Sequence, residues 1–132
     1  MELLISILGA ITAITVSAIG ALLANKNSLI LQIRKLKEEH YTSFVESLHN
    51  HTANDNEESL TRFVLARDKM FLIASENVIK KMLDYEDNGV GKSLEAHNFY
   101  LTELIKSIRA DLKLKDKNFP IISFKKANNN VE

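Results

Sequence analysis

The sequence predicts an all-α protein with a single N-terminal transmembrane helix followed by a small cytoplasmic helical bundle, assembled as a parallel homo-oligomer. Three observations point to this fold class. Residues 3–24 (LLISILGAITAITVSAIGALLA) carry no charge, the rest of the chain repeats apolar side chains at three- and four-residue steps, and 132 residues include one Pro and four Gly. This periodicity and the scarcity of helix-breaking residues favour helices throughout.

The uncharged stretch is long enough to cross a membrane. At about 1.5 Å per residue, a helix over residues 3–24 is roughly 33 Å long, close to the thickness of the hydrocarbon layer. A cleaved secretory signal is the competing interpretation. Against it, Glu2 precedes the stretch without any Lys or Arg, and Leu22-Leu23-Ala24 is a poor cleavage site. We therefore assign residues 1–25 to a transmembrane helix that stays in the protein.

One side of this helix consists of small residues. They recur at three- and four-residue steps within an arc of roughly 80°. They are Ser6, Gly9, Ala13, Ser17, Gly20 and Ala24. Small side chains let membrane helices approach closely, so this side predicts a contact between copies of the helix. Glu2 lies on the same side and would form a ring of carboxylates at one mouth of a pore. A plain oligomer seam, with Glu2 a solvated end residue, is the alternative.

Charge is balanced overall, with 17 basic and 17 acidic residues, but it is distributed in blocks. Lys26, Arg34, Lys35 and Lys37 follow the span, residues 38–103 hold 6 basic and 13 acidic residues, and residues 104–126 hold 7 basic and 2 acidic ones. Basic residues that flank only the C-terminal end of the span place that end in the cytoplasm. We expect a single-pass protein of the inner (cytoplasmic) membrane, with its N-terminus outside and its C-terminal body inside.

Residues 26–48 predict a juxtamembrane stalk helix. Its apolar face is formed by side chains at three- and four-residue steps, namely Leu29, Ile33, Leu36, His40, Phe44 and Leu48. The stalk either continues the span or begins afresh with Ser28 as its N-cap, since Asn25 and Asn27 favour a break. Residues 49–58 (HNHTANDNEE) then form a polar connector.

Three further helices are predicted in the body, which comprises residues 49–118 together with 28–48. The first covers about residues 57–74, Ser75 caps the second (SENVIKKMLDY), and Ser93 caps the third, over residues 93–114. Short loops between them predict an antiparallel bundle. The core candidates are Leu60, Phe63, Val64, Met70, Phe71, Ile73, Val78, Ile79, Met82, Leu83, Leu94, Leu101, Leu104, Ile105, Ile108 and Leu112. Residues 119–132 predict an extended strap around Pro120 that docks on the bundle or on a neighbouring copy.

No catalytic or metal-binding motif is complete in the sequence. GVGKS, residues 89–93, resembles the end of a phosphate-binding loop, but Glu86 stands where the full pattern needs a glycine. Lys92 and the N–H groups at the following helix start could still hold one phosphate; a plain turn and N-cap is the alternative. His49 and His51 have no further ligands nearby. The chain has no Cys and hence no thiolate chemistry. We expect no enzyme, no cofactor and no metal site.

The C-terminal basic block predicts a polyanion-binding surface. Lys106, Arg109, Lys113 and Lys117 keep helical steps and would share one face if the last helix persists that far. The predicted polyanion-binding residues are Lys92, Lys106, Arg109, Lys113, Lys115 and Lys117. A nucleic-acid backbone bound there would dissociate with added salt, and Phe119 and Phe124 would add stacking. A solvated face that pairs with the acidic middle of the same or an adjacent subunit is the alternative.

The body also resembles a known group of proteins. ARDKMFLIASENVIKKMLDY followed by ELIKSIRADLKL, within residues 57–114, is similar to a pattern of small bacterial single-span membrane proteins of anti-phage defence type. The distinctive residues are Ser75, Glu76, Arg109, Asp111 and Leu112. The Hailong-type transmembrane effector is the nearest in layout. The resemblance implies an oligomeric channel that DNA oligomers hold shut on an electropositive surface, and whose opening depolarises an infected cell.

Two hypotheses from different functional classes follow. The first is a homo-oligomeric effector that forms a gated ion channel, controlled by a ligand or partner on the cytoplasmic bundle. The second is a non-conducting, membrane-anchored tether or receptor for a soluble partner. The expected partners are further copies of the chain, the lipid bilayer, and a DNA oligomer, another polyanion or a co-encoded soluble protein.

Overall fold

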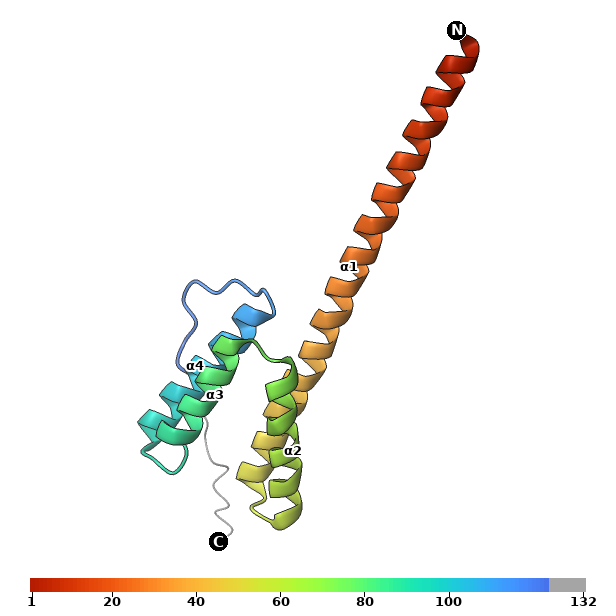
Figure 1. The fold of residues 1–132 in the computed structure, drawn as a ribbon. Helices are drawn as coiled ribbons and strands as arrows, with labels where there is room; N and C mark the ends of the chain where they lie inside the picture. Colours follow the sequence, from red (N-terminus) through yellow and green to blue (C-terminus); the bar gives the residue numbers. More distant parts are fainter. Residues whose placement is uncertain (124–132) are drawn as a thin grey trace. The chain divides into compact units, whose positions relative to one another are not determined.

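A computed structural model of the chain describes residues 1–123, and within that range it contains α-helices and no strand. The helices are α1 (Glu2–Ala53), α2 (Glu57–Ile73), α3 (Glu76–Asn88) and α4 (Leu94–Asp111), as drawn in Figure 1. The prediction of an all-α fold is confirmed for these residues. The chain divides into two compact units, Met1–Leu36 and Lys37–Glu132.

The first unit is the N-terminal part of α1. All of its residues are exposed, and α1 is long and apolar enough to cross a membrane. The helix passes through Asn25 and Asn27 without interruption, so the stalk continues the apolar stretch and does not begin afresh at Ser28. Leu29 and Ile33 are exposed in this unit, at 57% and 47%.

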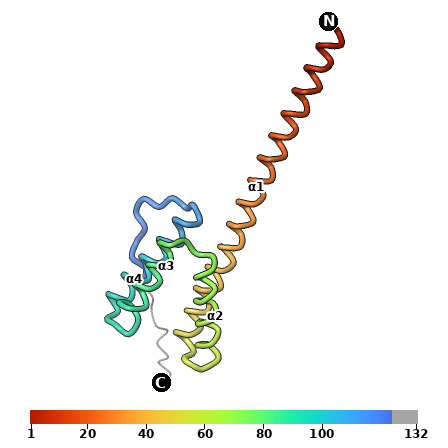
Figure 2. The backbone as a smooth tube through the Cα atoms, viewed as in Figure 1, coloured from red at the N-terminus to blue at the C-terminus, as the bar shows by residue number. Residues whose placement is uncertain are grey.

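The second unit consists of the end of α1 and the three shorter helices. α2 turns back from the end of α1, and α3 and α4 lie side by side as a hairpin (Figure 1). After α4 the chain reverses direction and returns along this hairpin, as the tube in Figure 2 shows. The unit is therefore a small bundle made of two helical hairpins, as the short loops predicted.

Every helix contributes to one hydrophobic core in the second unit. The buried side chains are Tyr41 and Phe44 of α1, Met70 of α2, Val78, Met82 and Tyr85 of α3, and Leu101, Leu104 and Ile108 of α4. The spacing of these residues at three, four and seven positions places them on one face of each helix. The end of α1 is thus part of the bundle, whereas the residues before Lys37 lack such cover.

The helix starts follow from side-chain caps. Val78 donates its N–H to Ser75 Oγ at 3.4 Å, and Ala96 donates to Ser93 Oγ at 3.2 Å, so both predicted serine caps are confirmed. Asn56 caps α2 by accepting the Ser59 N–H at 2.8 Å. The predicted connector over 49–58 is too long, because α1 continues to Ala53 and the Asn56 cap starts α2 directly afterwards.

Several predicted core residues lie on the surface instead. The exposed ones are Leu60, Val64 and Phe71 of α2, Leu83 of α3 and Leu94 at the start of α4. On α2 the buried positions are Ser59, Ala66 and Met70, which form a narrow strip of mostly small side chains. Large apolar residues on the other sides of α2 therefore have no place in the core of this unit.

Candidate functional site

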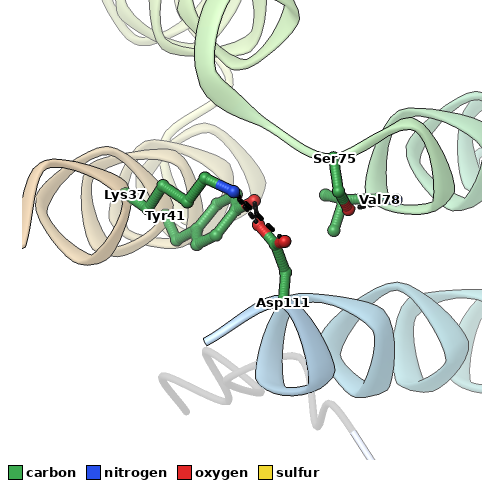
Figure 3. Close-up of polar contacts among 5 residues, drawn as sticks. All are labelled: Lys37, Tyr41, Ser75, Val78 and Asp111. Carbon is green, nitrogen blue, oxygen red and sulfur yellow. Dashed lines mark hydrogen bonds and ion pairs between the residues drawn. The ribbon is translucent and has the colours of Figure 1, made fainter. Parts of the chain in front are cut away.

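A charged cluster joins the last helix of the bundle to α1. Lys37 Nζ lies 3.0 Å from Asp111 Oδ2 and 3.2 Å from Asp111 Oδ1, and the Tyr41 hydroxyl donates a hydrogen bond to the same carboxylate. Figure 3 shows Lys37 and Tyr41 pointing from α1 toward Asp111 at the end of α4. The Asp111 side chain is 12% exposed and that of Tyr41 is almost fully buried, so this contact is shielded from water.

The local sequence explains how these groups meet. Lys37 and Tyr41 are four residues apart, so they occupy one face of α1, on which Phe44 is buried in the core. Asp111 is the last residue of α4. A carboxylate at that end of a helix is repelled by the partial negative charge of the helix dipole. Its position is therefore unfavourable within α4 alone, and the two donors of α1 compensate for it.

Burial and hydrogen bonding shift the pKa values of this cluster. Burial, the largest single effect, raises the pKa of Asp111, but hydrogen bonds from Tyr41 and Lys37 together outweigh it, so the net pKa lies below the usual carboxyl value. Burial is also the main cause that raises the pKa of Tyr41, and the adjacent Asp111 carboxylate adds to it. Near neutral pH the cluster therefore holds a charged aspartate and a neutral tyrosine.

The predicted basic face is interrupted because α4 ends at Asp111. Lys113 adopts φ +63°, its N–H bonds to the Ala110 carbonyl oxygen at 3.0 Å, and the Leu114 N–H bonds to the Arg109 carbonyl oxygen at 2.9 Å. This pair of bonds is a Schellman motif, which ends a helix. Lys113 and Lys117 therefore do not extend a helical face that begins at Lys106, and the single continuous face is corrected to a helix end followed by an irregular segment.

The six predicted polyanion-binding residues fall into two groups. Arg109 holds Asp116 through two hydrogen bonds of 2.8 and 2.7 Å and lies over the Phe119 ring at 5.1 Å, while Lys106 pairs with Glu103 at 2.8 Å. These cations are engaged within the chain. The exposed ones that make no ion pair with any residue from 1 to 123 are Lys92, Lys113, Lys115 and Lys117. Polyanion binding stays a prediction, centred on this second group.

The C-terminal segment docks on the bundle as far as the structure describes it. The Ile122 N–H donates to Thr102 Oγ1 on α4 at 2.9 Å, and the Arg109 guanidinium stacks on Phe119. These contacts match the expected strap on the chain's own bundle. Phe124 and the rest of the predicted tail lie outside the described residues.

The predicted pore or helix-contact residues lie along the first unit. All of them, Glu2, Ser6, Gly9, Ala13, Ser17, Gly20 and Ala24, are exposed. A Cβ atom added at Gly9 or at Gly20 would meet nothing within 4 Å. The fold of the single chain therefore gives no reason for glycine at either position.

An open polar groove of about 550 Å³ runs between the end of α1 and α2. Many of its lining side chains carry hydroxyl or amide groups, among them Ser47, Asn50 and Ser59, and Arg62 and Lys69 also line it. Within residues 1–123, no group of His, Cys, Asp and Glu could hold a metal ion.

No family model, curated protein or solved structure matches the chain.

The sequence analysis names two of the three residues of the central cluster and misses Tyr41. In the sequence, Lys37 belongs to the basic residues that predict the orientation of the span, and Asp111 belongs to the pattern that carries the resemblance. Two signals could have found the cluster: a Lys and a Tyr four residues apart beside the buried Phe44, and an acid in the last turn of a helix, where bases are favoured.

Proposed function

We propose that this protein is a single-span membrane effector that assembles as a parallel homo-oligomer and forms an ion channel controlled from its helical body. The basic block after the apolar stretch supports an N-terminus outside and a body in the cytoplasm of a bacterial cell. The resemblance in layout to the Hailong-type effector adds a role in anti-phage defence to the proposal.

The observation that carries the proposal is the uncovered small-residue side of α1. Gly9 and Gly20 have open space around them, and each glycine costs about 1 kcal/mol relative to alanine inside a helix. A lone helix in lipid gains nothing from that cost. Close contact with another helix does require small side chains, so the stripe supports self-association.

The hydroxyl groups of the apolar stretch also support the small-residue side of α1 as the contact or pore surface. Thr12 and Thr15 donate to the carbonyl oxygens of Leu8 and Ile11, at 2.9 and 2.8 Å, and so are satisfied within α1. Ser6 and Ser17 make no side-chain hydrogen bond within the described chain. Their hydroxyls remain available to a neighbouring helix or to water in a pore.

The cluster of Lys37, Tyr41 and Asp111 is the proposed point of control. Lys37 and Tyr41 belong to the helix that carries the apolar stretch, whereas Asp111 immediately precedes the exposed basic segment 113–117. A polyanion bound to that segment would shift the end of α4 and change the contact with α1. In this way ligand binding on the body would alter the conductance.

A measurement of ion flux distinguishes the proposed channel from the alternative, a non-conducting membrane-anchored tether or receptor. The full chain is reconstituted in liposomes loaded with K⁺, and efflux is measured with and without a DNA oligonucleotide. The proposal expects efflux that the oligonucleotide changes and that Gly9→Leu abolishes. Ala18→Leu, which introduces the same side chain outside the small-residue side of the helix, should leave the efflux intact. No efflux under any ligand condition would favour the tether or receptor.

A further inference from the structure

One acid holds the basic segment 113–117 on the last helix. Asp116 accepts two hydrogen bonds from the Arg109 guanidinium, at 2.8 Å from Nε and 2.7 Å from Nη2. The same guanidinium lies over the Phe119 ring, with 5.1 Å between Arg109 Cζ and the ring centroid. Asp116 and Phe119 therefore share one partner, and this single side chain of α4 holds the start of the chain beyond the helix.

Asp116 is surrounded in the sequence by cations. It is the only acid between residues 112 and 123, and Lys115 and Lys117 flank it directly. Neither of these lysines, nor Lys113, makes an ion pair within residues 1–123. The basic segment therefore carries uncompensated positive charge, and its one negative charge is the one that Arg109 binds.

The ion pair has the geometry in which arginine also binds phosphate. Two N–H groups of the guanidinium face the two oxygens of one carboxylate, and the oxygens of a phosphate match this fork as well. The Arg109 and Asp116 side chains are 35% and 21% exposed, so solvent reaches the pair. An ion pair with such exposure is weak, because water and salt screen it. A phosphate that the neighbouring lysines also attract can therefore displace this carboxylate.

We propose that Asp116 is a built-in competitor for phosphate, which occupies Arg109 while no ligand is bound and gives way to one phosphate of a polyanion. The lysines of the basic segment hold the other phosphates. Once Asp116 has left the guanidinium, the segment separates from α4 and Phe119 loses its stacking. This inference rests on the proposed function, because it names the exchange through which a polyanion acts on the body.

The exchange takes place beside the contact between α4 and α1. Arg109 and Asp111 both belong to the last turn of α4, where Asp111 binds Lys37. Burial raises the pKa of Asp111, and the charge of Lys113 is among the causes that lower it, so the basic segment acts on this carboxylate. A phosphate that neutralises Lys113 would weaken that effect. Polyanion binding on the basic segment would therefore act on the proposed point of control.

A tryptophan reporter tests the exchange, because the chain has no native Trp. Full-length Phe119→Trp keeps an aromatic ring for Arg109 and places a single emitter at the contact. The probe is inorganic tripolyphosphate, added at constant ionic strength to the protein in detergent, and its binding is measured in parallel by titration calorimetry. We expect the quenching of the Trp by acrylamide to increase as the probe binds, since the ring leaves the guanidinium.

A second titration of the same reporter, with a single-stranded DNA oligonucleotide, distinguishes the source of the phosphates. A larger response at equal phosphate concentration to the oligonucleotide would indicate a nucleic acid. A larger response to tripolyphosphate would indicate a small polyphosphate.

Removal of the competitor gives a second test. Asp116→Asn should bind tripolyphosphate up to about fivefold more tightly, which is the range that an exposed ion pair allows. Asp84→Asn removes an equal charge from the exposed side of α3 and should bind the probe as the wild type does. In the reporter, Asp116→Asn should increase the quenching before any probe is added. Equal affinities of the two variants, or a reporter that does not respond to Asp116→Asn, would overturn the proposal.

The outcomes separate the exchange from the proposed function. Binding of the probe with unchanged quenching would overturn the exchange and leave polyanion control of the channel standing. Absence of binding at low ionic strength, for both tripolyphosphate and the oligonucleotide, would overturn the exchange and the polyanion control together. K⁺ efflux from liposomes would then still decide whether the chain forms a channel. Unchanged circular dichroism of each variant would show that the helical body is intact.

Discussion

Lys37 Nζ lies 3.0 Å from Asp111 Oδ2, so the part of α1 that belongs to the bundle is held by a charge at the end of the last helix. An acid at a helix C-terminus breaks a local rule, and here the donors that compensate for it come from α1. A site where local preference and tertiary contact disagree is a common location of function. For this reason we place the control of the protein at this contact.

Replacement of Asp111 by Asn should destabilise the helical body by about 1–3 kcal/mol, because it leaves the Lys37 ammonium without its counter-charge in a shielded position. Thermal or urea unfolding of the full chain in detergent, followed by circular dichroism, measures this. Asp84→Asn on the exposed side of α3 is the matched control and should change stability by less than about 0.5 kcal/mol. Equal effects of the two changes would show that the cluster contributes nothing.

The same contact predicts a loss of stability in acid. The pKa of Asp111 is lowered in the folded protein, so the unfolded chain takes up the proton more readily. The contribution of the Asp111 carboxylate to the free energy of unfolding is complete above the ordinary carboxyl pKa of about 4. It is lost as the pH falls through the lower pKa that Asp111 has in the folded protein. The difference in stability between the wild type and Asp111→Asn should therefore shrink between about pH 6 and about pH 3. A constant difference over that range would contradict the assignment.

The sequence was sufficient for most of the fold. Charge-free residues 3–24 and the serines at 75 and 93 indicated the apolar helix and two helix starts, because both signals are local. The exposed side chains of Leu60 and Phe71 could not be foreseen, since periodicity identifies apolar positions but not which of them a small bundle can cover. Pairing of Lys37 with Asp111 joins residues that are far apart in sequence, which no local pattern reveals.

Replacement of Lys113 by glycine should stabilise the helical body. Its φ of +63° is a left-handed conformation that costs a side-chain-bearing residue about 1 kcal/mol and costs glycine almost nothing. Lys113→Gly should therefore raise the free energy of unfolding by up to about 1 kcal/mol, measured by the same urea titrations. Lys115→Gly, in the irregular segment beyond the motif, gives no such gain and serves as the control.

Binding of a DNA oligonucleotide should depend on the exposed lysines that follow α4. Lys113, Lys115 and Lys117 are exposed and form no ion pair within residues 1–123, so they can exchange counterions for phosphates. Fluorescence anisotropy over a salt series should show affinity that falls with salt, and a smaller salt slope after Lys113→Glu/Lys117→Glu. The exposed pair Lys80 and Lys69, changed to Glu, controls for net charge. Affinity that is absent at low salt, or equal in both double variants, would contradict a localised site.

The central claim is that the small-residue side of α1 brings copies of the chain together. Counting the copies of the full-length protein in lipid nanodiscs, by native mass spectrometry, tests it most directly. The account predicts several copies for the wild type and for Ala18→Leu, and far fewer for Gly9→Leu and Gly20→Leu, because the open space beside these glycines would be filled by a neighbour. A single copy in the wild type, or the same copy number in all four proteins, would contradict it.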